Sequence, residues 1–133
     1  MSHENVEVVR RVYQEGLFDR EPERILDLAS PDIEYVNPPE AIDPGIRRGR
    51  AEVRLALQNL SQSFDSYRHE LRELFDCGDA VVADVSFFVR SRGSGAEIVQ
   101  DEAHTWTLRD GMIVRYEWGR DLRAALEAAG LSE

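Results

Sequence analysis

Apart from a short alternating run at Ile33–Val36, the hydrophobic pattern of the chain changes its period near residue 65, and this change constrains the fold more than any other feature. Before it, apolar side chains recur three or four positions apart, as they do on one face of a helix. After it, apolar and polar side chains alternate in successive runs that turn residues separate, as in strands with one buried face. Helices followed by a series of strands predict an α+β fold, with the helices packed on one face of a curved antiparallel sheet.

Three helices are expected in the first half of the chain. The first has an apolar stripe made of Val6, Val9, Tyr13 and Leu17. A break follows over Asp19–Pro22, and Pro22 suits the first turn of a short second helix, because its missing N–H would have no partner there. The third helix is expected from about Arg50 to Phe64.

Five strands and a closing helix complete the expected fold. A short strand at Ile33–Val36 ends at Asn37, because two prolines follow that cannot donate to a strand ladder, and Glu40–Gly49 is expected as a loop. The other strands are expected at Tyr67–Phe75, Ala80–Arg90, Glu97–Arg109 and Met112–Gly119. Asp121 is the expected N-cap of a final helix over Leu122–Ala129.

Length and composition favour one domain without a nucleic-acid or membrane partner. The 133 residues, of which 42% are hydrophobic, suffice for a single domain spanning 1–133 with a sizeable core. The formal net charge of −10 repels phosphate backbones and anionic lipids. Cys77 is the only cysteine, which excludes an internal disulfide. The sequence has neither a signal peptide nor an apolar run of membrane-spanning length, so a cytoplasmic location is expected.

The hairpin between the last two strands decides which side chains face the interior. A two-residue loop, Asp110-Gly111, would put Arg115 and Glu117 on the same face as Trp106. A three-residue loop, Arg109-Asp110-Gly111, instead pairs Leu108 with Met112, Trp106 with Val114, His104 with Tyr116, and Glu102 with Trp118. A one-residue slip turns every side chain to the other face, so the apolar pattern selects the register. We predict the three-residue loop, because it gathers the apolar side chains on one face.

The predicted inner face gathers a histidine, a carboxylate and several aromatic rings. Its members on the last two strands are Glu102, His104, Trp106, Tyr116 and Trp118, and the neighbouring strand adds Val85 and Phe87. An apolar chamber with few polar groups is typical of a small-molecule pocket. We therefore expect these side chains to bind a small, mostly apolar ligand.

Several segments resemble the SnoaL-like branch of the NTF2-like superfamily, which includes proteins similar to ketosteroid isomerase and to polyketide cyclases. They are the ααβα order before the strands, Ser30–Tyr35, Arg48–Arg50 and Thr107–Val114. The likeness extends from Asn5 to Leu131. It implies a cone-shaped barrel whose sheet wraps around a pocket, and a homodimer formed through the outer face of the sheet. It leaves the reaction open, because the superfamily includes isomerases, cyclases, dehydratases, hydrolases and binding proteins.

Ketosteroid isomerase suggests roles for three positions. Its helix-one tyrosine, which donates to the developing enolate oxygen, corresponds to Tyr13. The base of that enzyme is an aspartate that follows the first strand and precedes a proline. Asn37 stands at this position here, and an amide cannot accept a proton at any useful pH. Its protonated aspartic acid in the oxyanion hole corresponds to His104.

His104 and Tyr13 are therefore the candidate catalytic residues, each with a structural alternative. With an ordinary pKa of about 6.5, His104 suits a general acid, a general base or a donor to a carbonyl, or else it is a core histidine. Tyr13 would stabilise an oxyanion or fill the core. Glu102 and Glu34 are carboxylates that could replace the missing base, although Glu102 could equally be solvated at the pocket rim. Asn37 either orients a ligand or ends its strand.

No metal and no cofactor is expected. His3, His69 and His104 lie on separate elements without ligand spacing, and no HExxH motif is present. Glycine-rich nucleotide motifs are also absent, and Gly93–Gly95 is expected as a hairpin tip. Asp84 falls on the outer face of its strand.

Three functional hypotheses stay open at this point. The first is a cofactor-free pocket enzyme that transfers a proton on a small carbonyl or hydroxyl compound by isomerisation, aldol-type cyclisation or dehydration. In it, His104 shuttles the proton and Tyr13 stabilises the oxyanion. The second is a non-catalytic small-molecule-binding domain, which Asn37 in the base position favours. The third is a structural dimer whose pocket is filled by its own side chains.

Overall fold

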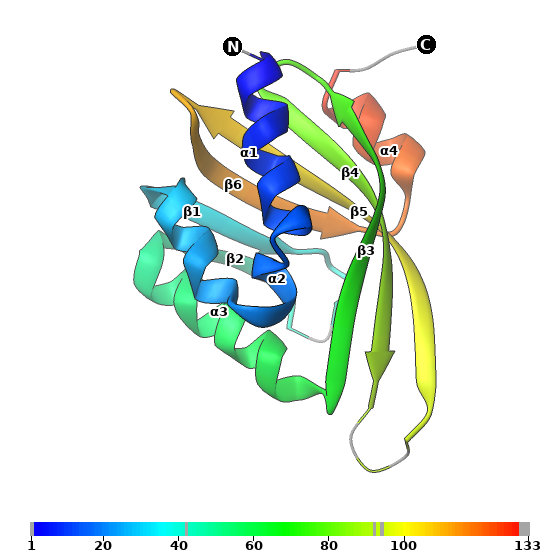
Figure 1. Ribbon diagram of the computed structural model, residues 1–133. Coiled ribbons are helices and arrows are strands. Elements are labelled where there is room, and N and C mark those ends of the chain that lie inside the picture. Colours follow the sequence, from blue (N-terminus) through cyan, green and yellow to red (C-terminus); the bar gives the residue numbers. More distant parts are fainter. Residues whose placement is uncertain (1, 42, 92, 94, 131–133) are drawn as a thin grey trace.

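A computed structural model describes residues 2–41, 43–91, 93 and 95–130 (Figure 1). The helices are α1 (Ser2–Gln14), α2 (Leu17–Arg20), the 3₁₀-helix η1 (Pro22–Leu28), α3 (Gly49–Ser63) and α4 (Leu122–Ala128). The strands are β1 (Ala29–Asn37), β2 (Gly45–Arg48), β3 (Ser66–Asp76), β4 (Ala80–Arg90), β5 (Glu97–Arg109) and β6 (Met112–Gly119). In this part of the chain, no helix has the length and hydropathy that a membrane span requires.

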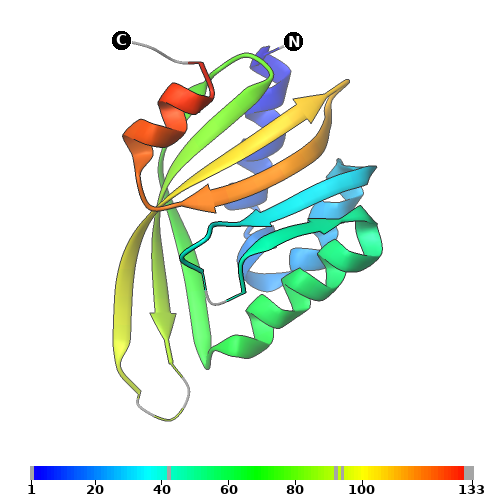
Figure 2. The ribbon, with the colours of Figure 1, turned by 180° about the vertical axis from the view of Figure 1, so that it is seen from behind.

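The strands form one curved sheet in the order β2-β1-β6-β5-β4-β3, and the sheet does not close into a barrel. The expected α+β fold is confirmed. Neighbouring strands are antiparallel except β1 and β6, which are parallel. Hairpins join β3 to β6 in succession, whereas α3 and four strands separate β1 from β6, and a connection of that length permits parallel pairing. Figures 1 and 2 show α1 and α4 on opposite faces of the sheet.

The helical half of the chain covers the inner face of the sheet. Gly16 adopts a left-handed φ of 66°, which ends α1 and allows α2 to start in a new direction. The expected second helix at Pro22 is the 3₁₀-helix η1. Buried side chains from these helices and from α3 are Val9, Val12, Leu17, Phe18, Ile25, Leu26, Val53 and Leu57. They pack against the inward side chains of the strands and form one core.

A short edge strand lies within the segment Glu40–Gly49, so the prediction of a loop throughout that segment is wrong. This strand, β2, pairs with β1 and places Ile46 opposite Val36. Its residues are half-buried or exposed, and Ile46 is 38% exposed. A short strand without a buried face leaves no alternation that sequence analysis could detect.

The β5–β6 hairpin has a different register from the predicted one. Its loop is the two-residue turn Asp110-Gly111, with left-handed φ values of 53° and 78°, so the three-residue loop is wrong. The observed pairs are Leu108 with Ile113, Trp106 with Tyr116, and His104 with Trp118, and Glu102 lies beyond the last paired residues. A bulge leaves Val114 unpaired in the ladder, and this extra residue returns Tyr116 and Trp118 to the inner face. The predicted face is therefore correct for Tyr116 and Trp118, but it is wrong at the start of β6, where Ile113 is buried and Met112 is 37% exposed.

The substitution Gly111→Ala tests the two-residue turn. A Cβ at this position meets nothing within 4 Å, so the substitution adds only the cost of a left-handed backbone. We expect it to lower the free energy of unfolding by about 1 kcal/mol in urea denaturation. Gly119→Ala is the matched control, because Gly119 lies outside the left-handed region and its surroundings are equally open. Equal losses for the two variants would contradict the turn.

Candidate active site

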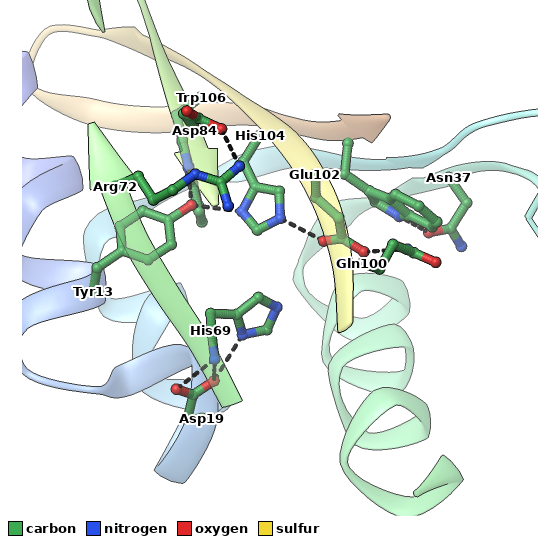
Figure 3. A network of polar contacts seen from close by, with 11 residues as sticks. Tyr13, Asp19, Asn37, His69, Arg72, Asp84, Gln100, Glu102, His104 and Trp106 are labelled. Carbon is green, nitrogen blue, oxygen red and sulfur yellow. Dashed lines mark hydrogen bonds and ion pairs between the residues drawn. The ribbon is translucent and has the colours of Figure 1, made fainter. Parts of the chain in front are cut away.

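A chain of hydrogen bonds runs through the core from α1 along β5 (Figure 3). The indole N–H of Trp106 lies 2.9 Å from the Tyr13 hydroxyl, which lies 2.6 Å from Nδ1 of His104. Nε2 of His104 lies 2.8 Å from one Glu102 oxygen, and the Gln100 amide nitrogen lies 2.7 Å from the other. Alternation along β5 turns these even-numbered side chains inward, so residues that the sequence suggested separately are joined in one network.

The chemistry of the partners fixes the direction of each bond. An indole N–H can only donate, so the Tyr13 oxygen accepts from Trp106. A carboxylate can only accept, so a neutral His104 donates to Glu102 from Nε2 and accepts the Tyr13 O–H at Nδ1. Nδ1 of His104 is therefore the nitrogen without a proton, and Nε2 carries the proton that it donates to Glu102. The Gln100 amide donates to the second oxygen of Glu102. The result is a neutral imidazole beside an ionised carboxylate.

Burial sets the protonation states of this network. His104 is completely buried, which lowers its pKa, and the hydrogen bond with Glu102 opposes this shift only in part. Burial likewise raises the pKa of the Tyr13 hydroxyl well above its ordinary range, against the opposing effect of the Trp106 N–H. Near neutral pH, His104 is uncharged and Tyr13 keeps its proton.

A second histidine faces the same space, although the sequence analysis gave it no role. Nδ1 of His69, on β3, lies 2.7 Å from the Asp19 carboxylate of α2. The same carboxylate accepts the backbone N–H of His69 at 3.0 and 3.1 Å. The ring stacks between Phe18 and Phe87, whose centroids are 4.4 and 4.5 Å away. The centroids of the His69 and His104 rings are 5.4 Å apart.

His69, Glu102 and His104 together could also hold a metal ion. One ligand atom from each lies within 4.8 Å of the others, so the expectation that the histidines have no ligand arrangement is wrong for His69 and His104. The sequence hides this arrangement because the two strands meet only through the sheet. Two imidazoles and a carboxylate suit divalent transition metals. In the observed hydrogen-bond pattern a metal would have to displace the proton on Nε2 of His104.

Exposure along β5 shows from which side a ligand can reach the network. His104 is 0% exposed and Glu102 is 7% exposed, whereas Gln100 is half-buried and Ile98 is 54% exposed. The inner face therefore becomes accessible toward the tip of the β4–β5 hairpin. Of the carboxylate and the imidazole in the network, Glu102 lies nearer to this accessible part.

A hollow of the described structure lies on the other face of the sheet. A cavity of about 550 Å³ separates α4 from that face, and its lining includes Thr105, Thr107, Glu117, Asp121 and Ala125. Of the predicted pocket residues, only Trp118 borders it. Trp106 and Tyr116 are buried core residues that pack against His104. Side chains thus fill the space where the sequence predicted an open chamber.

The remaining predicted binding residues frame the network. Asn37 accepts a hydrogen bond from the Trp118 indole at 2.7 Å and donates to the backbone oxygen of Asp43 at 2.8 Å, so both halves of its amide are engaged. It closes the segment after β1 and orients Trp118. On β4, Val85 lies opposite Glu102, and Phe87 lies opposite Gln100.

Three other carboxylates singled out in the sequence lie outside the network. Glu34 pairs with Arg48 and Arg115 at 3.0 and 2.9 Å. Asp121 accepts the Ala124 backbone N–H at 3.1 Å and caps α4, as predicted. Asp84 faces outward, as predicted, and lies 2.6 Å from Arg72.

Comparison with known proteins identifies the family. The sequence profile of the SnoaL-like domain matches residues 9–116. The chain belongs to the SnoaL-like family. The resemblance to the NTF2-like superfamily is thereby confirmed. No curated protein sequence matches the chain significantly.

Solved structures of this fold superimpose on most of the SnoaL-like chain. TerC, co-crystallised with polyporic acid, is 30% identical with a TM-score of 0.76, and the match covers 95% of this chain and 98% of TerC. An NTF2-like protein from Burkholderia thailandensis E264 is 25% identical with a TM-score of 0.77, covering 93% and 95% of the two chains. A protein with a ketosteroid isomerase-like fold from Catenulispora acidiphila DSM 44928, in complex with trimethylamine, is 17% identical with a TM-score of 0.75, covering 95% and 94%. This last likeness shows the fold alone.

His69 and Asp19 are the residues of this SnoaL-like site that sequence reasoning missed. His69 lies on the same face of a predicted strand as Tyr67 and Leu71, and this shared face was a signal that its side chain points inward. Asp19 carried no signal, because it lies in the break after the first helix. Only the tertiary fold brings it to β3.

The lowered pKa of His104 predicts a loss of stability in mild acid. In the unfolded chain His104 regains its ordinary pKa of about 6.5, so below that pH the unfolded state binds a proton that the folded state does not. Stability should be complete above about pH 6.5 and should fall as the pH drops toward the folded-state pKa.

The measurement is the free energy of unfolding from urea titrations between about pH 5.5 and 7.5. His104→Gln should make this free energy less dependent on pH across that range. His3→Gln is the control, because His3 is exposed, and it should keep the wild-type slope. An unchanged slope in His104→Gln would mean that His104 is not a buried neutral imidazole.

Proposed function

We propose that this SnoaL-like chain transfers a proton on a small, mostly apolar carbonyl or hydroxyl compound, in an isomerisation, cyclisation or dehydration. The observation that carries the proposal is the buried network from Trp106 to Gln100, with a carboxylate near its accessible end. Burying an imidazole and a carboxylate is unfavourable, and apolar side chains would fill the same volume at a lower cost. Their position beside the accessible part of the inner face favours chemistry over packing.

Glu102 is the group that takes the proton from the ligand in this proposal. It is the carboxylate of the network and lies on the part of β5 that leads toward the half-buried Gln100 and the exposed Ile98, and the two N–H groups from which it accepts hydrogen bonds hold it in place. His104 and Tyr13 act through it as positioning residues. The sequence had suggested that His104 moves the proton and that Tyr13 donates to the ligand, but their polar atoms are already engaged with each other and with Glu102. The complete burial of His104 favours its indirect role, and the contacts of the Tyr13 hydroxyl with Trp106 and His104 favour the same role for Tyr13.

Glu102 also supplies the base that the comparison with ketosteroid isomerase lacked. Asn37 stands in that base position, and its amide is occupied by Trp118 and Asp43. A carboxylate on β5 can reach a ligand on the same inner face from a different strand. The presence of Asn37 in place of the isomerase aspartate is therefore compatible with proton transfer by this chain.

Binding without chemistry is the second candidate function, and the filled interior favours it. The network is buried because its members His104 and Trp106 and the neighbouring Tyr116 are themselves buried. A ligand that does not react would then lie near Gln100, and the network would serve to stabilise the fold. The relative TerC was co-crystallised with polyporic acid. This complex suggests an aromatic compound rich in carbonyl and hydroxyl groups as the first ligand to test with this chain.

We also propose a homodimer that forms through the outer face of the sheet, and a cytoplasmic location. On that face, Phe88 of β4 lies opposite Val99 of β5, and Val99 is 54% exposed. Exposed apolar side chains on a sheet face favour association with a second copy.

The test of the proposed function combines binding and turnover. Polyporic acid should raise the melting temperature of the wild type, because a ligand that binds only the folded state stabilises it. With a compound that is turned over, Glu102→Gln should lower the rate by about 100-fold or more while binding persists. His104→Ala and Tyr13→Phe should lower it less.

Glu117→Gln is the control for this test, because Glu117 lies on the far face of the sheet and borders the α4 cavity. It should leave the rate unchanged. Binding with no product from wild type across cyclic enones, hydroxyketones and hydroxyquinones would reject proton transfer and leave the binding function. A Glu102→Gln rate equal to that of the wild type would reject the role of Glu102.

A further inference from the structure

The imidazole of His69 has one nitrogen engaged and one nitrogen available. Nδ1 lies 2.7 Å from the Asp19 carboxylate, and no hydrogen bond to Nε2 is found among the described residues. The side chain of His69 is only 4% exposed. Every buried side-chain nitrogen and oxygen of the described residues has a hydrogen-bond partner, so this unpaired nitrogen is an accessible atom that a ligand can reach.

Asp19 determines which nitrogen is available. A carboxylate can only accept a hydrogen bond, so Nδ1 of His69 donates and the lone pair lies on Nε2. Asp19 is held in place because it also accepts the backbone N–H of His69. When Nε2 takes a proton, this carboxylate stabilises the imidazolium that forms.

Two phenyl rings fix the direction in which the lone pair points. Phe18 and Phe87 stack on the two faces of His69, with interplanar angles of 28° and 23°. Rotation of the ring would break both stacks and the bond to Asp19. Figure 3 shows the nitrogen that does not face Asp19 on the side toward Glu102. Ligand atoms of His69 and Glu102 lie within 4.8 Å of each other.

We infer that His69, held by Asp19, is a second proton acceptor facing Glu102, and that this pair selects uncharged enols and phenols as ligands. The inference rests on the proposed function of the same site. An ionised carboxylate and a bare imidazole nitrogen both accept hydrogen bonds, so a ligand hydroxyl finds a partner between them and a ketone oxygen does not. The negative charges of Asp19 and Glu102 disfavour anionic ligands.

The reaction that follows from this geometry is the conversion of an enol to its ketone. The O–H bond of the ligand breaks, and the proton forms an N–H bond at Nε2 of His69. The oxygen electron pair forms the C=O bond, and the proton passes from Nε2 of His69 to the Glu102 carboxylate, from which the electron pair of the former C=C bond takes it at carbon. Atoms and electrons balance within the ligand, and no oxidant, reductant or co-reactant is needed.

The test compares the binding of 2-naphthol with that of 2-methoxynaphthalene, which has the same rings but no hydroxyl proton. Calorimetry on the full chain should give binding of 2-naphthol that is tighter by at least about tenfold, because the methyl ether leaves buried acceptors unpaired. His69→Phe keeps an aromatic ring between Phe18 and Phe87 and removes the lone pair. This variant should abolish the preference and leave the affinity for 2-methoxynaphthalene unchanged.

Asp19→Asn provides a second variant should His69→Phe fail to fold, and it should reduce the preference without removing the ring. His3→Phe is the control and should keep the wild-type preference. A preference that survives in His69→Phe would overturn the inference, as would failure of 2-naphthol to bind the wild type. The proposed function fails by a different result, namely turnover that does not depend on Glu102.

Discussion

The buried carboxylate of Glu102 is the constraint on which the rest of the site depends. A carboxylate moved from water into a protein core is strongly destabilising unless donors meet it, and here His104 and Gln100 each supply one. The O–H that Tyr13 donates to Nδ1 favours the tautomer in which His104 donates from Nε2, and Trp106 in turn orients the Tyr13 hydroxyl. Among the described residues, no buried side-chain nitrogen or oxygen lacks a hydrogen-bond partner. The network is therefore complete from α1 to the accessible part of β5.

This completeness divides the site into a positioning part and a reacting part. The buried members hold a fixed pattern of protons and leave no atom free for a ligand. Glu102 and Nε2 of His69 lie at the side from which a ligand would come, each supported by a partner behind it. In the proposed function they are two acceptors on two strands, and the curvature of the sheet brings them together.

The sequence predicted the fold and the faces better than the contacts. Alternation along β5 and the apolar pattern of β6 were enough to place His104, Glu102 and Trp106 inward, because a strand has only two faces. The bulge at Val114 was not predictable, since a two-residue loop with a compensating bulge puts Tyr116 and Trp118 on the same face as the three-residue loop that we expected. Asp19 and His69 meet only through the tertiary fold. Side chains fill the expected pocket because of how they pack in three dimensions, and the hydrophobic pattern of the sequence does not specify that packing.

The protonation of the His104 ring is the most direct test of this account. Nitrogen NMR of the full chain near neutral pH should show an uncharged ring with its proton on Nε2 and none on Nδ1. Tyr13→Phe should then alter the Nδ1 resonance of His104 first, because it removes the O–H that donates to this atom. An imidazolium ring in the wild type, or a ring with its proton on Nδ1, would contradict the proposed network and the support that it gives to Glu102.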